Sequence, residues 1–267
     1  MAVTFDAVGP SSAGASAAGA TSLTWSHTNN GNAIVAGCSA GAGNDAGMAT
    51  TATYAGAAMT AGAIVHTGVA STVGFVRVFT LLSPATGTNN VVVTLTGGTA
   101  DLTGGSVSCL GAGSFATQYS AQGNTATTAT ATSAGSSSDG LIVAFVADGN
   151  GTTSATAPST SRFIKNLNGN SGAGNNAGAT SPSTGSNVTT AWTISSDQWA
   201  VIGVEVLAGA AGDELARFRQ VPPGHGGPPN RGPSGWAAWA GTDDQPVGGP
   251  PADTRAPTFP SQYGGYY

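Results

Sequence analysis

Histidine, serine and acidic side chains are the residues of this chain that could carry out catalysis, and they form no obvious constellation. The histidines are His27, His66 and His225, and a serine-type triad would need an activated serine beside His27 or His66. Most acidic residues before residue 210 fall in turns rich in Gly and Asn, where aspartate forms local hydrogen bonds. The sequence therefore nominates no carboxylate pair for glycoside hydrolysis and no catalytic residue, and we expect a non-enzymatic protein.

Metal and cofactor sites are equally hard to place. Asp148-Gly149-Asn150-Gly151-Thr152 resembles the start of a calcium loop but lacks the bidentate glutamate at position twelve, so a turn between strands is the better interpretation. Cys38 and Cys109 each lie in an apolar strand-like block, without the spacing of a zinc site. We expect two buried free thiols, with a disulfide as the alternative, and no bound metal or cofactor.

Aromatic side chains offer another kind of site, because the face of a sugar ring stacks on an exposed aromatic ring. The candidates for stacking on a glycan are Trp25, Tyr54, Trp192 and Trp199. The competing interpretation is that each ring fills the interior of a domain built from small residues. The sequence favours packing and leaves both interpretations open.

Charge is scarce in this chain. Only 7 % of the residues are charged, against roughly 25 % in a typical soluble domain. The net charge is -5 and the seven basic residues do not cluster, so we expect no nucleic-acid partner. No apolar run reaches the length of a membrane-spanning helix, and no basic stretch precedes an apolar segment near Met1. We therefore expect neither a membrane partner nor a secretory signal peptide.

The elements that must position these residues are short β-strands. Blocks rich in β-branched residues recur every 8–15 residues or so, divided by clusters of Gly, Asn, Ser and Pro. The predicted strands are Val3–Val8, Leu23–His27, Ala33–Ser39, Thr50–Tyr54, Ala63–Thr67, Phe75–Leu82, Asn90–Thr96, Ser106–Leu110, Thr125–Thr132, Leu141–Ala147, Arg162–Asn166, Val188–Ile194 and Gln198–Leu207. Without helices or a long repeat, they predict an all-β, two-sheet antiparallel sandwich of jelly-roll type.

Two of these strands carry positional information. Leu141–Ala147 is apolar on both faces, which is typical of a central strand that is covered on both sides. Thr125–Thr132 alternates Thr and Ala without a bulky residue, which favours an edge or a thin layer. The long stretch from Asn168 to Gly185 is interpreted as a Gly-rich connector.

The composition changes near Gly209. Residues 1–209 hold 4 of the 14 prolines, whereas the remaining 58 residues hold 10. We predict a β-sandwich domain over 1–209, a short helical or turn connector over 210–221, and an extended Pro/Gly-rich arm over 222–267. Such an arm has no core of its own and is partly polyproline II.

Six aromatic residues distinguish the arm from an ordinary linker. They are Trp236, Trp239, Phe259, Tyr263, Tyr266 and Tyr267. Each ring can bury a large area while freezing few torsions, so these residues are the candidates for docking onto a partner. The alternative is a disordered tail with incidental aromatics.

Four stretches, Leu23–Thr28, Thr53–Thr60, Leu82–Val93 and Ser196–Val204, cover in order and spacing nearly all of residues 1–209. They resemble a Gly/Ala/Thr-rich β-sandwich domain of tailed-phage virion proteins, especially minor tail and capsid decoration proteins of actinobacterial phages, which is also seen in some bacterial surface proteins. The arm is not part of this pattern. The resemblance implies a fold and a virion setting, and brings no catalytic residues.

Together these features predict an accessory structural protein of a tailed-phage virion, attached through its C-terminal arm and assembled in the host cytoplasm. Its expected partners are other virion proteins, with copies of the chain forming a homo-oligomer or symmetric array. The alternative is a carbohydrate-binding or adhesion module on a host-contacting fibre, whose partner is a cell-surface glycan.

Overall fold

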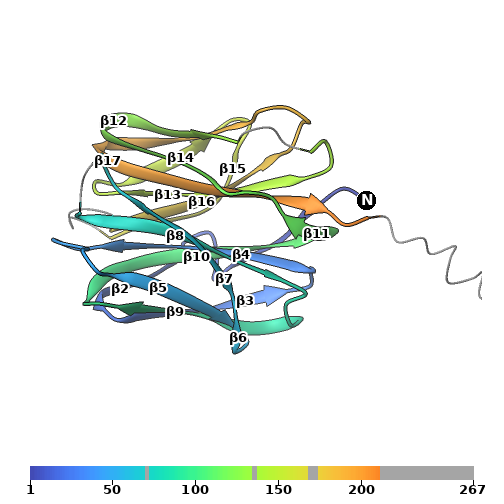
Figure 1. The fold of residues 1–267 in the computed structure, drawn as a ribbon, viewed down its shortest axis with the longest axis horizontal. Helices are drawn as coiled ribbons and strands as arrows, with labels where there is room; N and C mark the ends of the chain where they lie inside the picture. Colours follow the sequence, from blue (N-terminus) through green and yellow to red (C-terminus); the bar gives the residue numbers. More distant parts are fainter. Residues whose placement is uncertain (70–71, 134–136, 168–173, 211–267) are drawn as a thin grey trace, which may run out of the picture. The chain divides into compact units, whose positions relative to one another are not determined.

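Every regular element of the described residues is a β-strand (Figure 1). The structure is a computed structural model that describes residues 1–69, 72–133, 137–167 and 174–210. All strand pairings in it are antiparallel. The all-β prediction is confirmed, but the strands form three sheets where two were expected.

Sheet A is the middle layer and has six strands, in the order β1-β10-β4-β8-β7 with β2 also paired to β10. Its strands are β1 (Thr4–Gly9), β2 (Ala15–Ala20), β4 (Ala33–Gly41), β7 (Thr60–His66), β8 (Gly74–Leu82) and β10 (Ala100–Leu110). Every residue of β4 is buried, because this strand is covered on both faces.

Sheets B and C cover the two faces of sheet A. Sheet B has the order β3-β9-β5-β6. Its strands are β3 (Ser22–Asn29), β5 (Ala49–Tyr54), β6 (Ala57–Ala58) and β9 (Gly87–Thr96). Sheet C has the order β11-β17-β13-β16-β15, with β12 and β14 also paired to β17. Its strands are β11 (Ala112–Phe115), β12 (Tyr119–Thr132), β13 (Leu141–Asp148), β14 (Thr152–Thr156), β15 (Thr160–Asn166), β16 (Asn175–Pro182) and β17 (Thr189–Ala208).

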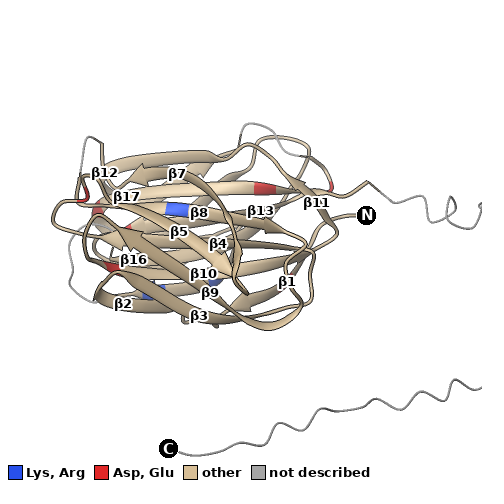
Figure 2. Cartoon of the chain, turned by 60° about the horizontal axis from the view of Figure 1, so that its bottom comes forward, with Lys and Arg blue, Asp and Glu red and all other residues tan. Residues whose placement is uncertain are grey.

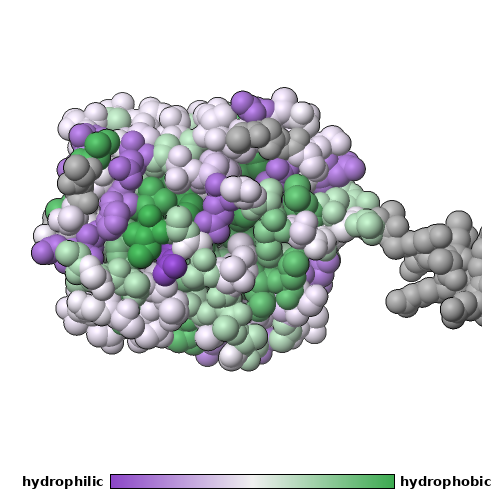
Figure 3. Space-filling model, viewed as in Figure 1, coloured by the Kyte–Doolittle hydropathy of each residue, from purple (hydrophilic) through white to green (hydrophobic). Residues whose placement is uncertain are grey.

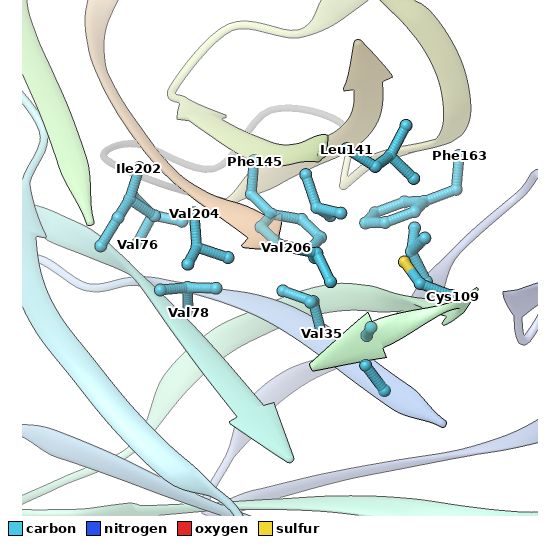
Figure 4. Packing of buried hydrophobic residues seen from close by; sticks show 14 of the residues in the cluster. Val35, Val76, Val78, Cys109, Leu141, Phe145, Phe163, Ile202, Val204 and Val206 are labelled. Carbon is cyan, nitrogen blue, oxygen red and sulfur yellow. The ribbon is translucent and has the colours of Figure 1, made fainter. Parts of the chain in front are cut away.

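Two hydrophobic cores follow from this layering. Between sheets A and C, Val35 and Val78 pack with Phe145, Ile202 and their neighbours (Figure 4). Between sheets A and B, a second cluster of buried residues includes Leu23, Trp25, Ile34, Phe79 and Val91. Successive residues of β4 point to opposite faces of the sheet, so the one strand contributes to both cores.

Glycines make room for the largest rings of the first core. A Cβ added at Gly37 of β4 would lie 2.2 Å from the ring of Phe145, and one at Gly178 of β16 would lie 2.4 Å from the ring of Phe163. The two rings lie 6.1 Å apart, centroid to centroid. These glycines therefore leave the space that the large aromatic rings fill.

Sheet C folds back over its own outer face. β17 runs for 20 residues, and its second half pairs with β13 while its first half pairs with β14. β12 pairs with β17 along most of its length. The curled sheet encloses a third cluster of buried residues, which includes Trp192, Ile194, Trp199, Val146 and Ala177.

The predicted strands differ from the observed ones where small polar residues form strands. The predicted connector from Asn168 to Gly185 contains β16, which is buried except at Pro182 and lies between β13 and β15. The predicted strands Val188–Ile194 and Gln198–Leu207 belong to the single strand β17. The central position of Leu141–Ala147 is confirmed, because β13 is wholly buried between β16 and β17.

Charged residues are rare on the outer faces of the molecule's described part (Figure 2). The strands of sheet B contain no Lys, Arg, Asp or Glu, and neither do β12 and β14. In Figure 3 the upper left, where β12 is labelled in Figure 1, and much of the lower margin, where sheet B lies, are pale rather than strongly hydrophilic. These outer faces carry mainly hydroxyl, amide and methyl groups.

Candidate functional site

The four candidate glycan-stacking residues are buried. Tyr54 and Trp192 have 0 % of their surface exposed, Trp25 has 4 % and Trp199 has 9 %. Trp25 and Tyr54 lie in the core between sheets A and B, and the other two lie inside the curled sheet C. A stacked sugar needs an open ring face, so we correct the stacking interpretation of these residues and assign them to packing.

The structure brings His27 next to a serine, a contact that the spacing in the sequence does not reveal. His27 Nδ1 lies 2.8 Å from Ser106 Oγ, and Trp25 Nε1 donates a hydrogen bond to the same oxygen at 2.9 Å. The indole can only donate, whereas the Ser106 hydroxyl can both accept and donate, so the direction of the His27–Ser106 hydrogen bond depends on the tautomer of the ring. His27 is 1 % exposed and Ser106 is fully buried, so no substrate reaches this pair.

Burial controls the ionisation of His27. It lowers the pKa of His27 to about 4, although the negative charge of Asp6 acts in the opposite direction. The Asp6 carboxylate is itself held by hydrogen bonds from Ser108 Oγ at 2.7 Å and from the backbone N–H of Asn30 at 2.9 Å. This polar cluster joins β1, β3 and β10 and has a structural role.

Ser39 is a second serine whose surroundings exclude catalysis. It lies in Gly37-Cys38-Ser39-Ala40-Gly41, which matches the G-x-S-x-G pattern of a nucleophile elbow, so the expectation that the sequence holds no such pattern is wrong. An elbow requires a sharp turn between a strand and a helix, whereas these residues run through the interior of β4. The Ser39 hydroxyl is fully buried and bonds to Thr103 Oγ1 and to the carbonyl of Asn175.

Of the two histidines that the structure describes, His66 is the one that solvent can reach. Its side chain is 43 % exposed, and its Nδ1 lies 2.8 Å from Oδ2 of the fully buried carboxylate of Asp45. The same oxygen accepts a hydrogen bond from the backbone N–H of Gly74 at 3.1 Å. When the ring is neutral, Nδ1 is therefore the donor and Nε2 keeps its lone pair, an orientation suited to accepting a proton or binding a metal.

A small cavity lies at the same end of sheet A, where Asp101, Gly41 and Gly74 are aligned in register. Its volume is about 180 Å³, and Gly43, Thr99 and Asp101 are among its lining residues. Asp101 Oδ1 accepts a hydrogen bond from the backbone N–H of Gly19 at 2.8 Å. This cavity is smaller than the roughly 300–1,000 Å³ of ordinary ligand pockets, and it lacks their apolar and aromatic lining.

The carboxylate of Asp148 is occupied by its own turn. Oδ1 accepts hydrogen bonds from the backbone N–H groups of Asn150, at 3.0 Å, and of Gly151, and Oδ2 accepts one from Thr152 Oγ1. Burial raises the pKa of Asp148, and these hydrogen bonds oppose that effect. The interpretation of this segment as a turn between strands is confirmed.

Cys38 and Cys109 are free and buried, as expected. Burial raises the pKa of both thiols to about 12. They lie in different cores, Cys38 between sheets A and B and Cys109 between sheets A and C. At neutral pH both thiols are protonated and unreactive.

Two searches of the described ranges complete this survey. No group of three or more His, Cys, Asp or Glu side chains among the residues placed by the structure could hold a metal ion. In the same part of the chain, no helix is long and apolar enough to cross a membrane.

The predicted docking residues Trp236, Trp239, Phe259, Tyr263, Tyr266 and Tyr267 lie outside the described residues. The same holds for His225 and, except for Ala210, for the predicted connector over 210–221. Their proposed roles stay predictions.

Comparisons with protein-family models, with curated proteins and with solved structures found no match to this chain. The resemblance to phage virion domains therefore stays a prediction that the all-β fold accommodates.

Proposed function

We propose that this chain is an accessory structural protein of a tailed-phage virion, a minor tail or capsid decoration protein that attaches through its C-terminal arm. The virion is its location, after assembly in the host cytoplasm. The observation that carries the proposal is the change in composition after Gly209. A domain rich in β-branched residues is followed there by a Pro/Gly-rich segment with six aromatic rings.

The folded domain supports the proposal because its interior is complete. All three tryptophans of residues 1–210 lie in clusters of buried residues, so no tryptophan of this part of the chain is left over to bind a partner. Its outer strands offer small, neutral side chains that suit close neighbours on a particle surface.

The arm supports the proposal through its chemistry. Proline disfavours regular strands and helices, and residues 222–260 contain ten prolines, so we expect that the six rings build no core among themselves. Rings spaced along an extended segment bind instead to shallow pockets on neighbouring subunits. Many such contacts on one chain add up to stable attachment even where each one is weak.

Truncation tests the proposal. A chain ending at residue 221 should fold, with the same strand content and thermal stability as the full chain, and should no longer co-purify with assembled particles. A matched control keeps the arm at full length and replaces the six aromatic residues with serine. We expect this variant to lose attachment as well, because the rings and not the length hold the arm.

Two results would overturn the proposal. One is a truncated protein that still joins particles in normal amount. The other is a serine-substituted arm that attaches as well as the natural one, which would show that the aromatic residues are incidental.

A further inference from the structure

The second half of β12 is an edge with no strand beside it among the described residues. β12 pairs only with β17, and its last five residues, Thr128 to Thr132, do so without a break in register. Thr128, Thr130 and Thr132 are exposed, while Ala129 and Ala131 are buried against sheet C. β12 lies at the upper margin of the molecule in Figure 1.

Two hydrogen bonds fix which backbone groups face outward. The N–H of Ser133 donates to the carbonyl of Val188 at 3.0 Å, and Thr190 Oγ1 donates to the carbonyl of Ala131 at 3.2 Å. Ser133 and Ala131 therefore turn their backbone groups toward β17. Because these groups alternate along a strand, the N–H and C=O groups of the three exposed threonines point to the open edge.

Other outer strands are protected in ways that β12 is not. β7 has a bulge between Ala61 and Ile64, and its backbone is bonded by Gln118 Oε1 at Ala63 and by Arg77 Nε at Gly62. β15 carries Arg162 and Lys165, and β6 has only two residues. Charges, bulges and short length are the usual means of preventing edge pairing. Thr128–Thr132 contains no charge and no register shift, and the register shifts of β12 lie before it, between Gly123 and Thr128.

We propose that two copies of this chain associate edge to edge through Thr128–Thr132, forming an antiparallel ladder across a two-fold axis at Thr130. The segment reads Thr-Ala-Thr-Ala-Thr in both directions, so it is self-complementary, as a two-fold interface requires. Thr130 faces its own equivalent, and Thr128 faces Thr132 of the second copy. This pairing forms about six backbone hydrogen bonds.

The side chains fit the same arrangement. All three threonines lie on the outer face, where cross-strand threonine pairs form hydrogen bonds between their hydroxyls. The protein already uses such pairs inside its own sheets, at Thr132–Thr189 and at Thr28–Thr88, both with 2.8 Å between the Oγ1 atoms. No charged residue occurs in β12, so the strand brings no like charges together at the axis.

The association is weak for an isolated pair, because five residues bury far less than a standard protein interface. It becomes effective where copies are already held close together, since a second contact then forms at high local concentration. The inference does not rest on the virion role, because it concerns the folded domain alone.

Site-directed cross-linking of the full chain tests both the edge and its register. With a short bismaleimide, Thr130→Cys should give several-fold more covalent dimer than Thr193→Cys, which lies on the same face but one strand inward. Thr128→Cys and Thr132→Cys should cross-link when the two proteins are mixed and much less when each is alone. The two natural cysteines contribute little background because they are buried and protonated.

Equal dimer yields from Thr130→Cys and Thr193→Cys would overturn the proposal, because they would reflect random collision. Thr128→Cys cross-linking as well alone as in the mixture would reject the register.

A second measurement of dimer formation uses no introduced cysteine. In sedimentation velocity, the natural chain and Thr193→Lys should shift toward dimer as concentration rises, while Thr130→Lys should not, since it brings two ammonium groups together at the axis. A natural chain that stays monomeric up to its highest soluble concentration would contradict the inference.

Discussion

Single residues of this protein act mainly through size. Gly37 faces the ring of Phe145, Gly105 faces the ring of Phe163, and Gly203 faces Tyr119, each so closely that an added Cβ would lie 2.2–2.6 Å from the ring. The high glycine content is therefore partly a packing device. A sequence pattern gives no sign of it, because glycine in a strand is otherwise a sign of weakness.

Gly37→Ala should destabilise the domain by about 1–3 kcal/mol, because the new methyl group overlaps the Phe145 ring between two sheets that cannot separate locally. Gly43→Ala is the matched control, since nothing lies within 4 Å of its added Cβ. The control should change stability by less than about 0.5 kcal/mol. Urea unfolding followed by circular dichroism measures the stability of both variants. Equal unfolding midpoints for the two would show that Gly37 is not needed to make room for the ring of Phe145.

His27 should make the protein less stable in mild acid. Its pKa in the folded protein, about 4, lies below the ordinary value of 6.5, so folding favours the neutral ring. The stability it contributes is complete above pH 6.5 and is lost as the pH falls toward 4, by on the order of 3 kcal/mol in full. The free energy of unfolding of the natural chain should therefore fall more steeply over this range than that of His27→Gln.

An NMR titration of the ring checks the cause directly. The His27 resonances should keep their neutral shifts down to about pH 5. A midpoint near 6.5 for His27, or identical pH dependence of stability in the natural chain and His27→Gln, would contradict this account.

At the scale of elements, strands made of bulky β-branched residues could be predicted from the sequence. Leu141–Ala147 and Phe75–Leu82 were placed within a residue or so, because their side chains can only be buried. β16 could not be placed, since Asn, Ala, Gly and Thr favour turns and loops when taken alone. These residues form a strand through their pairing with β13 and β15, and Gly178 leaves room there for the ring of Phe163.

The candidate site was predicted less well than the fold. His27–Ser106 and His66–Asp45 join residues 79 and 21 positions apart, and nothing local in the sequence indicates these contacts. The alternation of Thr and Ala in Thr125–Thr132 favours an edge or a thin layer, because such a strand packs on one side only, and among the described residues the second half of β12 is an edge. The alternation of residues within a strand indicates which of its faces is buried. Which side chains come into contact depends on the register between strands that are distant in the sequence.

For the folded domain as a whole, the presence of a third sheet means that sheet A is buried on both faces. Two sheets would share a single core, whereas here β4, β8 and β10 each contribute buried residues to the core on either side. Losing sheet B would expose Ile34, Phe79 and Leu102, and losing sheet C would expose Val35, Val78 and Val107. Unfolding of either outer sheet would therefore expose the buried residues on one face of sheet A.

This sharing predicts that residues 1–210 unfold in a single step. Trp25 reports on the core between sheets A and B, and Trp192 and Trp199 report on the interior of sheet C. In protein labelled with fluorotryptophan, the ¹⁹F signals of these three residues should lose their native shifts at the same urea concentration. Replacing Trp236 and Trp239 with phenylalanine removes the two signals of the arm. If Trp192 and Trp199 melted before Trp25, the curled part of sheet C would be a separate unit that opens on its own, and the shared middle sheet would not unite the domain.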